Sequence, residues 1–302
     1  MARGKDIHWI AADWGTTNLR CWAMGDNGTI HAKAESGDGM ANIVSEQDCD
    51  FERALLRLVN PWLVDGKTMQ VRACGMVGAK AGWVEVPYSA VPCPPSTPTT
   101  MVSPKSPALE VHIHAGVKQG EPADVMRGEE TQLAGLIAKD PGFEGLVCLP
   151  GTHSKWVGIS GGNVIYFQTF LTGELFSLLS KKSVLSQTLT GDGDELDRVA
   201  FREGFLASLD NPQSWLPSLF SLRAEALLAG LAPPAARSRL SGILLGCEFG
   251  AMQGKFGLGE VALAASDTLA GSYCLAFETL GVKAIRHNPE ELVLAGLCPD
   301  RI

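Results

Sequence analysis

Residues 8–24 read HWIAADWGTTNLRCWAM, and this stretch gives the first indication of the fold class. A short apolar run, 8–12, ends at Asp13, and a second run rich in strand-forming residues, 17–24, follows the small polar turn 15–17. The turn signal GDNG at 25–28 leads into a third such run at 29–34. Tight turns between strand-like runs are typical of hairpins. The sequence therefore predicts three consecutive antiparallel strands.

The chain then alternates between helix and strand. Apolar residues of 51–62 recur at helical spacing, and Pro61 stands where that helix should end, before a predicted strand at 69–74. The segment 86–107 is rich in proline, serine and threonine, so we expect an extended surface excursion around any later strands. A helix is predicted at about 129–138. These alternations indicate an α/β lobe.

The order of elements at the N-terminus recurs in the second half. A strand-like run at 146–149, a polar turn at 150–155, a run at 156–159, a glycine turn at 161–162 and a run at 163–170 follow one another. Two copies of one unit predict a duplicated lobe with a cleft between the copies. Helices around 175–179, 240–249 and 269–280 and strands at 261–264 and 282–285 complete the second copy. We predict an N-terminal lobe, 1–142, and a C-terminal lobe, 143–302.

Composition narrows the function classes. The 302 residues suit two lobes, and a net charge of −8 without a long basic run argues against nucleic-acid or anionic membrane partners. The eight cysteines stand singly, without Cys-x-x-Cys pairs, and are predicted to be reduced core thiols. There is no apolar leader and no apolar run of membrane-spanning length, which predicts a cytoplasmic protein.

The two polar turns are suited to binding anions. A tight turn of glycine and threonine presents N–H groups and hydroxyls that a phosphate can approach closely. Asp13 adds a carboxylate able to hold Mg²⁺ directly or through water. Either turn alone is more typical of an ordinary hairpin with a capping aspartate. Their recurrence at equivalent places in a duplicated unit favours phosphate binding.

The chain resembles a known family over nearly its whole length. The stretch ADWGTTNLR at 12–20 is similar to the first phosphate motif of the sugar kinase, actin and Hsp70 superfamily. GMVG at 75–78 with GW at 82–83, MRGEETQL at 126–133, PGTHSKW at 150–156 and LTGEL at 171–175 resemble 2-dehydro-3-deoxygalactonokinases. The resemblance implies two ribonuclease-H-like lobes, with mixed sheets flanked by helices and an interlobe active-site cleft. It also implies ATP, Mg²⁺ and transfer of the γ-phosphoryl group to the 6-hydroxyl of 2-dehydro-3-deoxy-D-galactonate, in galactonate catabolism.

The same resemblance suggests roles for the charged residues near 129. Glu129 is the candidate base for the attacking hydroxyl, with Glu130 as the alternative, although both also fit carboxylates that only complement a helix dipole. Related sugar kinases carry aspartate at a similar place. Arg127 is the candidate partner of the substrate carboxylate, and a salt bridge to Glu130 or to a neighbouring residue is its alternative.

The remaining assignments fall into three groups. We expect phosphate contacts from Gly15, Thr16, Thr17, Gly151, Thr152 and Lys155, sugar contacts from Gly75, Met76, Gly78, Trp83, Thr172 and Glu174, and the adenosine region at Ala265 and Ser266. Structural alternatives stay open: a solvated loop lysine at 155, a turn with a buried tryptophan at 75–83, and a helix cap at Thr172. His153 is expected to pack or to order its loop and not to act as the base. Ala79-Lys80 replaces the usual Ser-Asn pair of the family, and Ala265 stands where relatives often have glycine.

The leading interpretation is a sugar-acid kinase whose partners are ATP and a small sugar acid. A kinase for another sugar or sugar acid, and a non-catalytic nucleotide-binding or sugar-binding sensor on the same fold, are the alternatives. The sequence does not give the oligomeric state, and a homodimer is left open.

Overall fold

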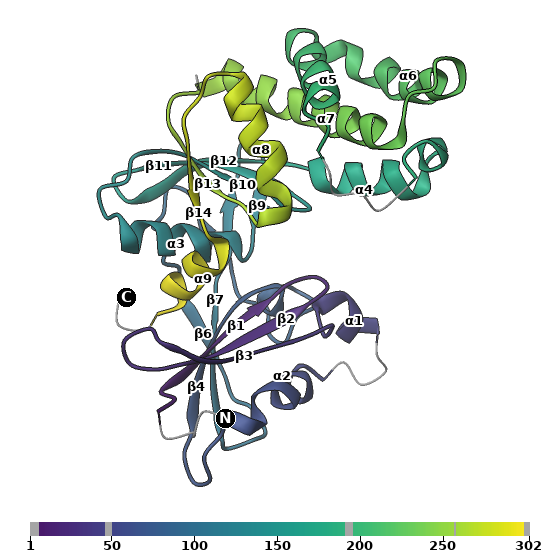
Figure 1. The fold of residues 1–302 in the computed structure, drawn as a ribbon. Coiled ribbons are helices and arrows are strands. Elements are labelled where there is room, and N and C mark those ends of the chain that lie inside the picture. The colour runs from purple at the N-terminus through teal and green to yellow at the C-terminus, as the bar shows by residue number, and fades with distance from the viewer. Residues whose placement is uncertain (1–5, 46–49, 191–195, 257, 299–302) are drawn as a thin grey trace. The chain divides into compact units, whose positions relative to one another are not determined.

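The computed structural model of the protein describes residues 6–45, 50–190, 196–256 and 258–298 (Figure 1). The chain forms two compact units. Unit 1 comprises Met1–Glu144, Ile159–Tyr166 and Pro289–Ile302, and unit 2 comprises Gly145–Gly158 and Phe167–Asn288. These units differ from the predicted division after residue 142, because two later segments group with unit 1.

The main sheet of unit 1 has six strands in the order β3-β2-β1-β4-β7-β6. The strands are β1 (Trp9–Trp14), β2 (Leu19–Met24), β3 (Ile30–Ser36), β4 (Met69–Gly75), β6 (Thr99–Val102) and β7 (Leu109–His114). β1 pairs antiparallel with β2, and β2 pairs antiparallel with β3, which confirms the predicted run of three antiparallel strands. β4 lies parallel to β1 and to β7. The sheet is therefore mixed.

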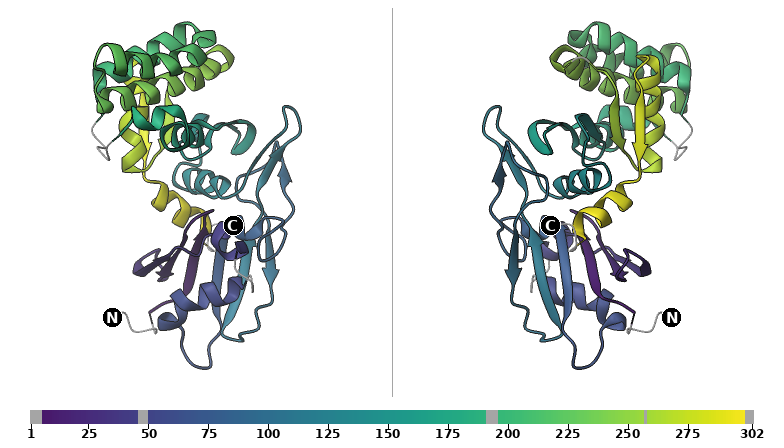
Figure 2. Two further views of the ribbon diagram at one scale, coloured as in Figure 1. Left: turned by 90° about the vertical axis from the view of Figure 1, so that its right-hand side faces the viewer. Right: turned by 90° about the vertical axis from the view of Figure 1, so that its left-hand side faces the viewer.

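Helices cover the two faces of this sheet (Figures 1 and 2). Successive side chains of a strand point to opposite faces. Ile10, Ala12 and Trp14 of β1 accordingly share one apolar cluster with α2 (Phe51–Val59), whereas Trp9 and Ala11 share another with α9 (Pro289–Leu297). The remaining elements of unit 1 are α1 (Met40–Ser45), α3 (Glu129–Lys139) and a small sheet of β5 (Ser89–Ala90), β8 (Val117–Gln119) and β9 (Asp124–Met126).

α9 explains why the C-terminal segment groups with unit 1. Gly135 of α3 lies against the carbonyl of Leu292, and Gly296 of α9 lies against the carbonyl of Thr131, so closely that a β-carbon at either glycine would overlap the facing backbone. Glycine permits this approach because it has no side chain. α9 thus fixes α3, whose first turn carries the predicted base.

The second sheet, whose strands lie mostly in unit 2, repeats the strand order of the main sheet of unit 1. Its five strands run β12-β11-β10-β13-β14, so the first three strands in sequence are followed across the sheet by the fourth and fifth, as in β3-β2-β1-β4-β7. The strands are β10 (Gly145–Leu149), β11 (Ser154–Ser160), β12 (Asn163–Phe170), β13 (Val261–Ala264) and β14 (Ala284–His287). β10, β13 and β14 are parallel neighbours. The recurrence bears out the duplicated, ribonuclease-H-like architecture.

Five helices among the described residues complete unit 2, namely α4 (Thr172–Lys182), α5 (Arg198–Asp210), α6 (Trp215–Leu228), α7 (Pro233–Phe256) and α8 (Asp267–Thr279). The core lies between the sheet and α5, α7 and α8. There the ring centroid of Phe249 is 5.1 Å from that of Trp156 and 4.8 Å from that of Phe277. Aromatic pairs at such spacing add stability beyond the area that they bury.

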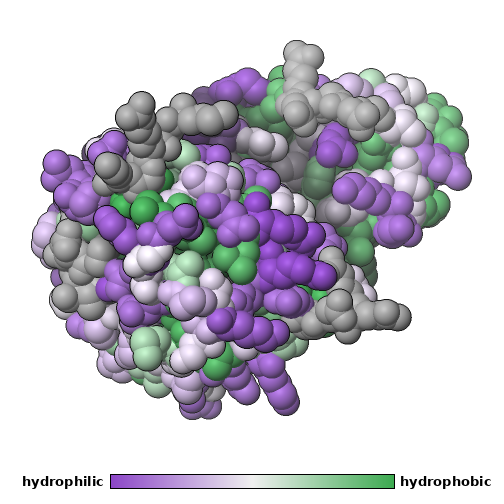
Figure 3. All heavy atoms as spheres, turned by 90° about the horizontal axis from the view of Figure 1, so that it is seen from below, coloured by the Kyte–Doolittle hydropathy of each residue, from purple (hydrophilic) through white to green (hydrophobic). Residues whose placement is uncertain are grey.

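The exposure of the cysteines differs in part from the expectation that all of them lie in the core. Cys21, Cys74 and Cys148 are buried and free, but Cys274 is exposed, so the prediction of core thiols is wrong for that residue of α8. Hydrophilic residues occupy most of the face drawn in Figure 3, with hydrophobic ones in smaller areas among them. Within the described ranges, no helix combines the length and the apolar character needed to cross a membrane.

Candidate active site

Three strands of unit 1 gather polar groups around Asp13. Asp13 lies opposite Arg20 on β2 and opposite Cys74 on β4. Its carboxylate forms an ion pair with Arg20, and the Cys74 thiol lies 3.8 Å from Oδ1. Burial favours neutral thiols, and together with the charge of Asp13 it raises the pKa of Cys74 well above its ordinary value. Cys74 therefore stays a neutral thiol beside the Asp13 side chain.

The first polar turn is tied to the start of α1. Gly15 N–H donates to the carbonyl of Asn18 at 2.9 Å, which closes the turn between β1 and β2. Backbone N–H groups of residues 39–41 donate to the carbonyls of Thr17, Gly15 and Thr16 at 2.9–3.1 Å. Both threonines are exposed. The loop backbone is thus held from behind, while Thr16 and Thr17 face solvent.

The ends of β1 and β4 meet the start of α3 at two glycines. Gly75, with φ of +87°, packs against the carbonyl of Trp14 so closely that a β-carbon would overlap it. Gly128 has φ of +113°, and a β-carbon there would lie 3.3 Å from the α-carbon of Gly75. Side chains other than glycine rarely adopt such φ values. The glycines therefore bring Glu129 close to the strand end that carries Asp13.

The two neighbouring glutamates occupy different environments. Glu130 is fully buried, and both of its carboxyl oxygens accept the Gly128 N–H, at 2.7 and 2.9 Å. Desolvation, and next the negative charge of Glu129, raise the pKa of Glu130 to about 8. Glu129 is half-buried, and its Oε2 accepts the Arg127 N–H at 3.1 Å. At neutral pH Glu130 accordingly carries a proton.

Arg127 is oriented by contacts with the segment after β4. Its Nη2 donates to the carbonyl of Val86 at 2.8 Å, and its guanidinium carbon lies 4.2 Å from the ring centroid of Tyr88. Nε and Nη1 are buried and have no hydrogen-bond partner within the described part of the chain. A β-carbon at Gly78 would lie 2.8 Å from Nη1, so this glycine makes room for the guanidinium. The predicted salt bridge from Arg127 to Glu130 is not among the ion pairs of the described residues.

Trp83 combines core packing with partial exposure. It is half-buried, packs against the core of unit 1, and its ring centroid lies 6.5 Å from that of Trp14. Met76–Gly78 forms a single 3-10 turn directly after β4, and Trp83 N–H donates to the carbonyl of Val77 at 2.8 Å. The segment is thus a turn carrying a packed tryptophan, one side of which is open.

The second polar turn, in unit 2, is tied to the first turn of α4. Glu174 N–H donates to the carbonyl of Thr152 at 2.9 Å, and the Glu174 carboxylate lies 2.7 Å from Nε2 of His153. A β-carbon at Gly173 would overlap the carbonyl of Gly151. The His153 contact agrees with the expectation that this residue orders its loop. The second polar turn and the start of α4 are therefore held together.

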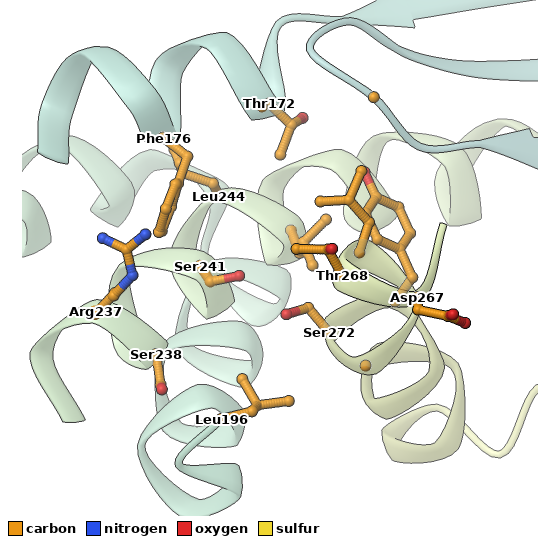
Figure 4. Close-up of a pocket in the computed structure, with 16 residues that line it drawn as sticks. Thr172, Phe176, Leu196, Arg237, Ser238, Ser241, Leu244, Asp267, Thr268 and Ser272 are labelled. Carbon is orange, nitrogen blue, oxygen red and sulfur yellow. The ribbon is translucent and has the colours of Figure 1, made fainter. Parts of the chain in front are cut away.

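Beside this loop lies a pocket of about 380 Å³ (Figure 4). Gly151, Thr172 and Gly173 form one part of its lining. Most of the rest comes from α4, α7 and α8, including Phe176, Arg237, Ser241, Leu244, Asp267, Thr268 and Ser272, and Leu196 comes from the segment before α5. The Arg237 guanidinium carbon lies 4.8 Å from the ring centroid of Phe176. In Figure 4 the hydroxyls of Ser241 and Ser272 point toward the space between α7 and α8. A mostly apolar pocket with a few inward polar groups is typical of a small-molecule site.

Comparison with known proteins identifies the family. The model of the 2-keto-3-deoxy-galactonokinase family matches residues 13–299. The chain belongs to this family.

Individual members are similar over almost the whole chain. The probable 2-dehydro-3-deoxygalactonokinase DgoK1 of Rhizobium meliloti (strain 1021) is 34% identical over 96% of this chain and 95% of its own length. The 2-dehydro-3-deoxygalactonokinase of Escherichia coli (strain K12) is 34% identical over 90% of each chain. A crystal structure from Sinorhizobium meliloti, provisionally named a 2-dehydro-3-deoxygalactonokinase, superposes with a TM-score of 0.86 over 96% of both chains at 34% identity.

Three residues predicted at the site of this kinase family do not line the pocket. Lys155 is predicted in a polar turn, but β11 already begins at Ser154, and Lys155 is only 4% exposed. Ala265 is buried in the core of unit 2, and Ser266 precedes α8, so neither lines the pocket. The adjacent residues 267–273 do line it. The predicted adenosine region thus lies within a few residues of the pocket wall.

The sequence reasoning missed the wall contributed by α7. Arg237, Ser241 and Leu244 recur at the i, i+4, i+7 spacing of one helix face, and this pattern was the available signal. It also missed Glu248 of α7, whose carboxylate lies behind the pocket. The hydroxyl of Thr172 bonds to that carboxylate, and α4 has no side-chain cap hydrogen bond at its start, so the alternative of Thr172 as a helix cap is wrong.

Proposed function

We propose that this chain phosphorylates 2-dehydro-3-deoxy-D-galactonate at its 6-hydroxyl, with ATP as the donor, giving the 6-phosphate and ADP in galactonate catabolism. The observation that carries the proposal is the pocket beside Gly151 and Gly173 in a chain of the 2-keto-3-deoxy-galactonokinase family. Phosphoryl transfer needs positioning and charge neutralisation more than covalent chemistry from the protein.

The nucleotide is assigned to unit 2. The adenosine would occupy the apolar part of the pocket, near Phe176 and Leu244, with the hydroxyls of Ser241 and Ser272 in reach of its polar edges. The phosphates would extend toward Gly151 and Thr152, where glycine leaves the backbone open to an anion. Gly15, Thr16 and Thr17 are proposed as the phosphate-binding residues of unit 1.

Mg²⁺ would arrive with ATP as part of the substrate. Among the described residues, no group of three or more His, Cys, Asp or Glu side chains could hold a metal ion. A magnesium ion bound to phosphates needs only one or two protein carboxylates and keeps several waters. Asp13, next to the first phosphate loop, supplies one such carboxylate. This donor set fits a metal that phosphates hold first.

Glu129 is proposed as the base. A base must reach the hydroxyl and be ionised before it accepts the proton. Glu130 fails both conditions because its side chain is fully buried and its pKa is raised to about 8. Glu129 is half-buried and follows Gly128, at the strand ends where Asp13 lies. We therefore favour Glu129 and give Glu130 a role in fixing the start of α3.

Arg127 is proposed to bind the carboxylate of the sugar acid. Guanidinium groups bind carboxylates through two parallel hydrogen bonds. Nε and Nη1 of Arg127 lack partners within the described residues, and a buried donor without an acceptor is costly, so an incoming carboxylate would relieve that cost. Gly75, Met76, Gly78 and Trp83 are proposed to line the sugar site beside it. Thr172 and Glu174, by contrast, are better placed to support the phosphate loop.

The test is ADP release from Mg²⁺-ATP with a panel of acceptors: 2-dehydro-3-deoxy-D-galactonate, its gluconate epimer, galactonate, hexoses and glycerol. We expect release with the first acid and not with hexoses or glycerol. Glu129→Gln should lower kcat at least about a hundredfold while ATP still binds. An equal rate with a hexose would contradict the substrate assignment, and an active Glu129→Gln enzyme would contradict the base.

We further propose a cytoplasmic location, because an enzyme that consumes ATP works where ATP is supplied.

A further inference from the structure

A buried carboxylate lies behind the nucleotide pocket and has no role in the reaction as proposed. Glu248, on α7, is 1% exposed. Its Oε1 accepts the indole N–H of Trp156 at 2.8 Å, and the Tyr273 hydroxyl lies 3.1 Å from both carboxyl oxygens. Its Oε2 accepts the hydroxyl of Thr172. Three donors from β11, α4 and α8 thus converge on one carboxylate of α7.

These donors lie on both sides of the second phosphate loop. Thr172 begins α4, whose next two residues contact the loop through Gly173 against the carbonyl of Gly151 and through Glu174 N–H to the carbonyl of Thr152. Tyr273, on the other side, lies 2.6 Å from the hydroxyl of Ser154, the residue that follows the loop. Both connections end at Glu248.

The direction of the hydrogen bonds follows from the carboxylate. An ionised carboxylate only accepts, so Thr172, Trp156 and Tyr273 must donate to it. Tyr273 has a single proton, and once that proton points at Glu248, the Ser154 hydroxyl donates to the Tyr273 oxygen. The carboxylate therefore sets the orientation of each hydroxyl around the loop. Hydrogen bonds to an ionised group are roughly twice as strong as neutral ones.

We infer that Glu248 is a positioning residue for ATP: it holds Thr172 and Tyr273, and through them the loop 150–153 and the pocket wall, in the geometry that receives the nucleotide. Thr172 and Tyr273 both line the pocket, so a shift in either changes its shape. Sites are precise when a second layer of hydrogen bonds fixes the groups that contact the ligand. This inference rests on the proposed nucleotide site in unit 2.

The test is the affinity for Mg²⁺-ATP, measured by titration calorimetry without any sugar acid, so that it does not depend on turnover. The variants are Glu248→Gln, Thr172→Val and the double variant. Glu248→Gln should lower the affinity for ATP about tenfold, as expected for losing a hydrogen bond to a buried charge. The double variant should bind ATP no more weakly than Glu248→Gln does, because the effects of residues that act through one contact are not additive. In turnover assays KM for ATP should rise while KM for the acid stays within about twofold.

Phe201→Leu is the matched control. Phe201 is a fully buried residue of the same core, on α5, and stacks on Phe205. Its replacement should lower the melting temperature at least as much as Glu248→Gln and leave ATP affinity unchanged. If Glu248→Gln does not fold, Thr172→Val and Tyr273→Phe, which keep the carboxylate, replace it with the same expectation.

The inference would be overturned if Glu248→Gln and Thr172→Val bound ATP as tightly as Phe201→Leu does. So would failure of the unmodified protein to bind ATP. If the unmodified protein binds ATP and the variants bind it more weakly as expected, while no acid promotes ADP release, the positioning role stands and the proposed substrate is wrong.

Discussion

Replacement of Glu130 by glutamine tests how far burial has raised the pKa of Glu130. Glu130 is fully buried, and its pKa is raised from 4.5 to about 8, first by desolvation and then by the charge of Glu129. In the folded protein the group therefore keeps its proton over a pH range where the unfolded chain has lost it. Stability falls with rising pH wherever the folded state binds more protons. The contribution is fully present below pH 4.5 and is lost as the pH rises through about 8.

The magnitude follows from the size of the shift. Each unit of pKa corresponds to about 1.36 kcal/mol, so the shift amounts to roughly 3–5 kcal/mol between the two ends of the range, with a slope of about 1.4 kcal/mol per pH unit. The glutamine side chain of Glu130→Gln does not titrate and can still accept the Gly128 N–H through its amide oxygen. The free energy of unfolding of Glu130→Gln relative to the unmodified protein should therefore rise steadily from about pH 5 to about pH 8.5.

Urea unfolding followed by tryptophan fluorescence is the assay. Five of the seven tryptophans, Trp9, Trp14, Trp22, Trp62 and Trp83, belong to unit 1, which contains Glu130, so the signal reports mainly on that unit. Glu121→Gln is the control, because it makes the same chemical change at an exposed position of unit 1 and leaves the charge of Glu129 in place. A difference between Glu130→Gln and the unmodified protein that stays constant across the range would refute the reasoning.

Three further predictions concern single contacts. Gly173→Ala places a β-carbon against the carbonyl of Gly151. It should lower the affinity for ATP, measured by calorimetry, by more than about tenfold without changing KM for the acid. Unchanged affinity for ATP would contradict the proposed phosphate loop. Arg127→Lys keeps the charge but loses the two-pronged donor, so KM for the sugar acid should rise about tenfold or more while KM for ATP stays constant. A rise in both would argue for a general role in unit 1. Gly135→Ala forces α3 away from Leu292 and should lower the unfolding free energy of unit 1 by roughly 1–3 kcal/mol, as overpacking usually does, measured by urea unfolding.

The elements that could be predicted from the sequence are those with local signals. Glycine turns and strand-forming runs placed the first three strands of each sheet to within about two residues, because tight turns are encoded by adjacent residues. β7 was not predicted, since it pairs with β4 across an intervening irregular segment. α6 was missed because apolar residues occupy all of its sides, so no helical periodicity marks it. Elements defined by distant partners give little local pattern.

The site shows the same division. The two polar turns are local and were predicted, but the pocket wall from α7 and the role of Glu248 depend on distant partners. Glu248 is 92 residues from Trp156 and 76 from Thr172. From sequence alone, a glutamate inside a helix is predicted to be exposed, because its neighbours in space are not known. Likewise, nothing in the sequence separates Glu129 from Glu130, whereas burial separates them clearly.

The two copies of the repeated unit use the same positions for different chemistry. Counting from the glycines of the polar turns, Gly15 and Gly151, the residue five places later is Arg20 in unit 1 and Trp156 in unit 2. Arg20 pairs with a carboxylate on its own sheet, Asp13, which stands near the loop where an Mg²⁺-phosphate would bind. Trp156 donates to a carboxylate from a helix, Glu248, which is buried. In the proposed function the duplication would thus supply two phosphate loops, one backed by the partly exposed carboxylate of Asp13 and the other by the buried carboxylate of Glu248. Exchanging these arrangements would fail in both directions, since an arginine in place of Trp156 would be buried in an aromatic core and a tryptophan in place of Arg20 would leave Asp13 without its cation.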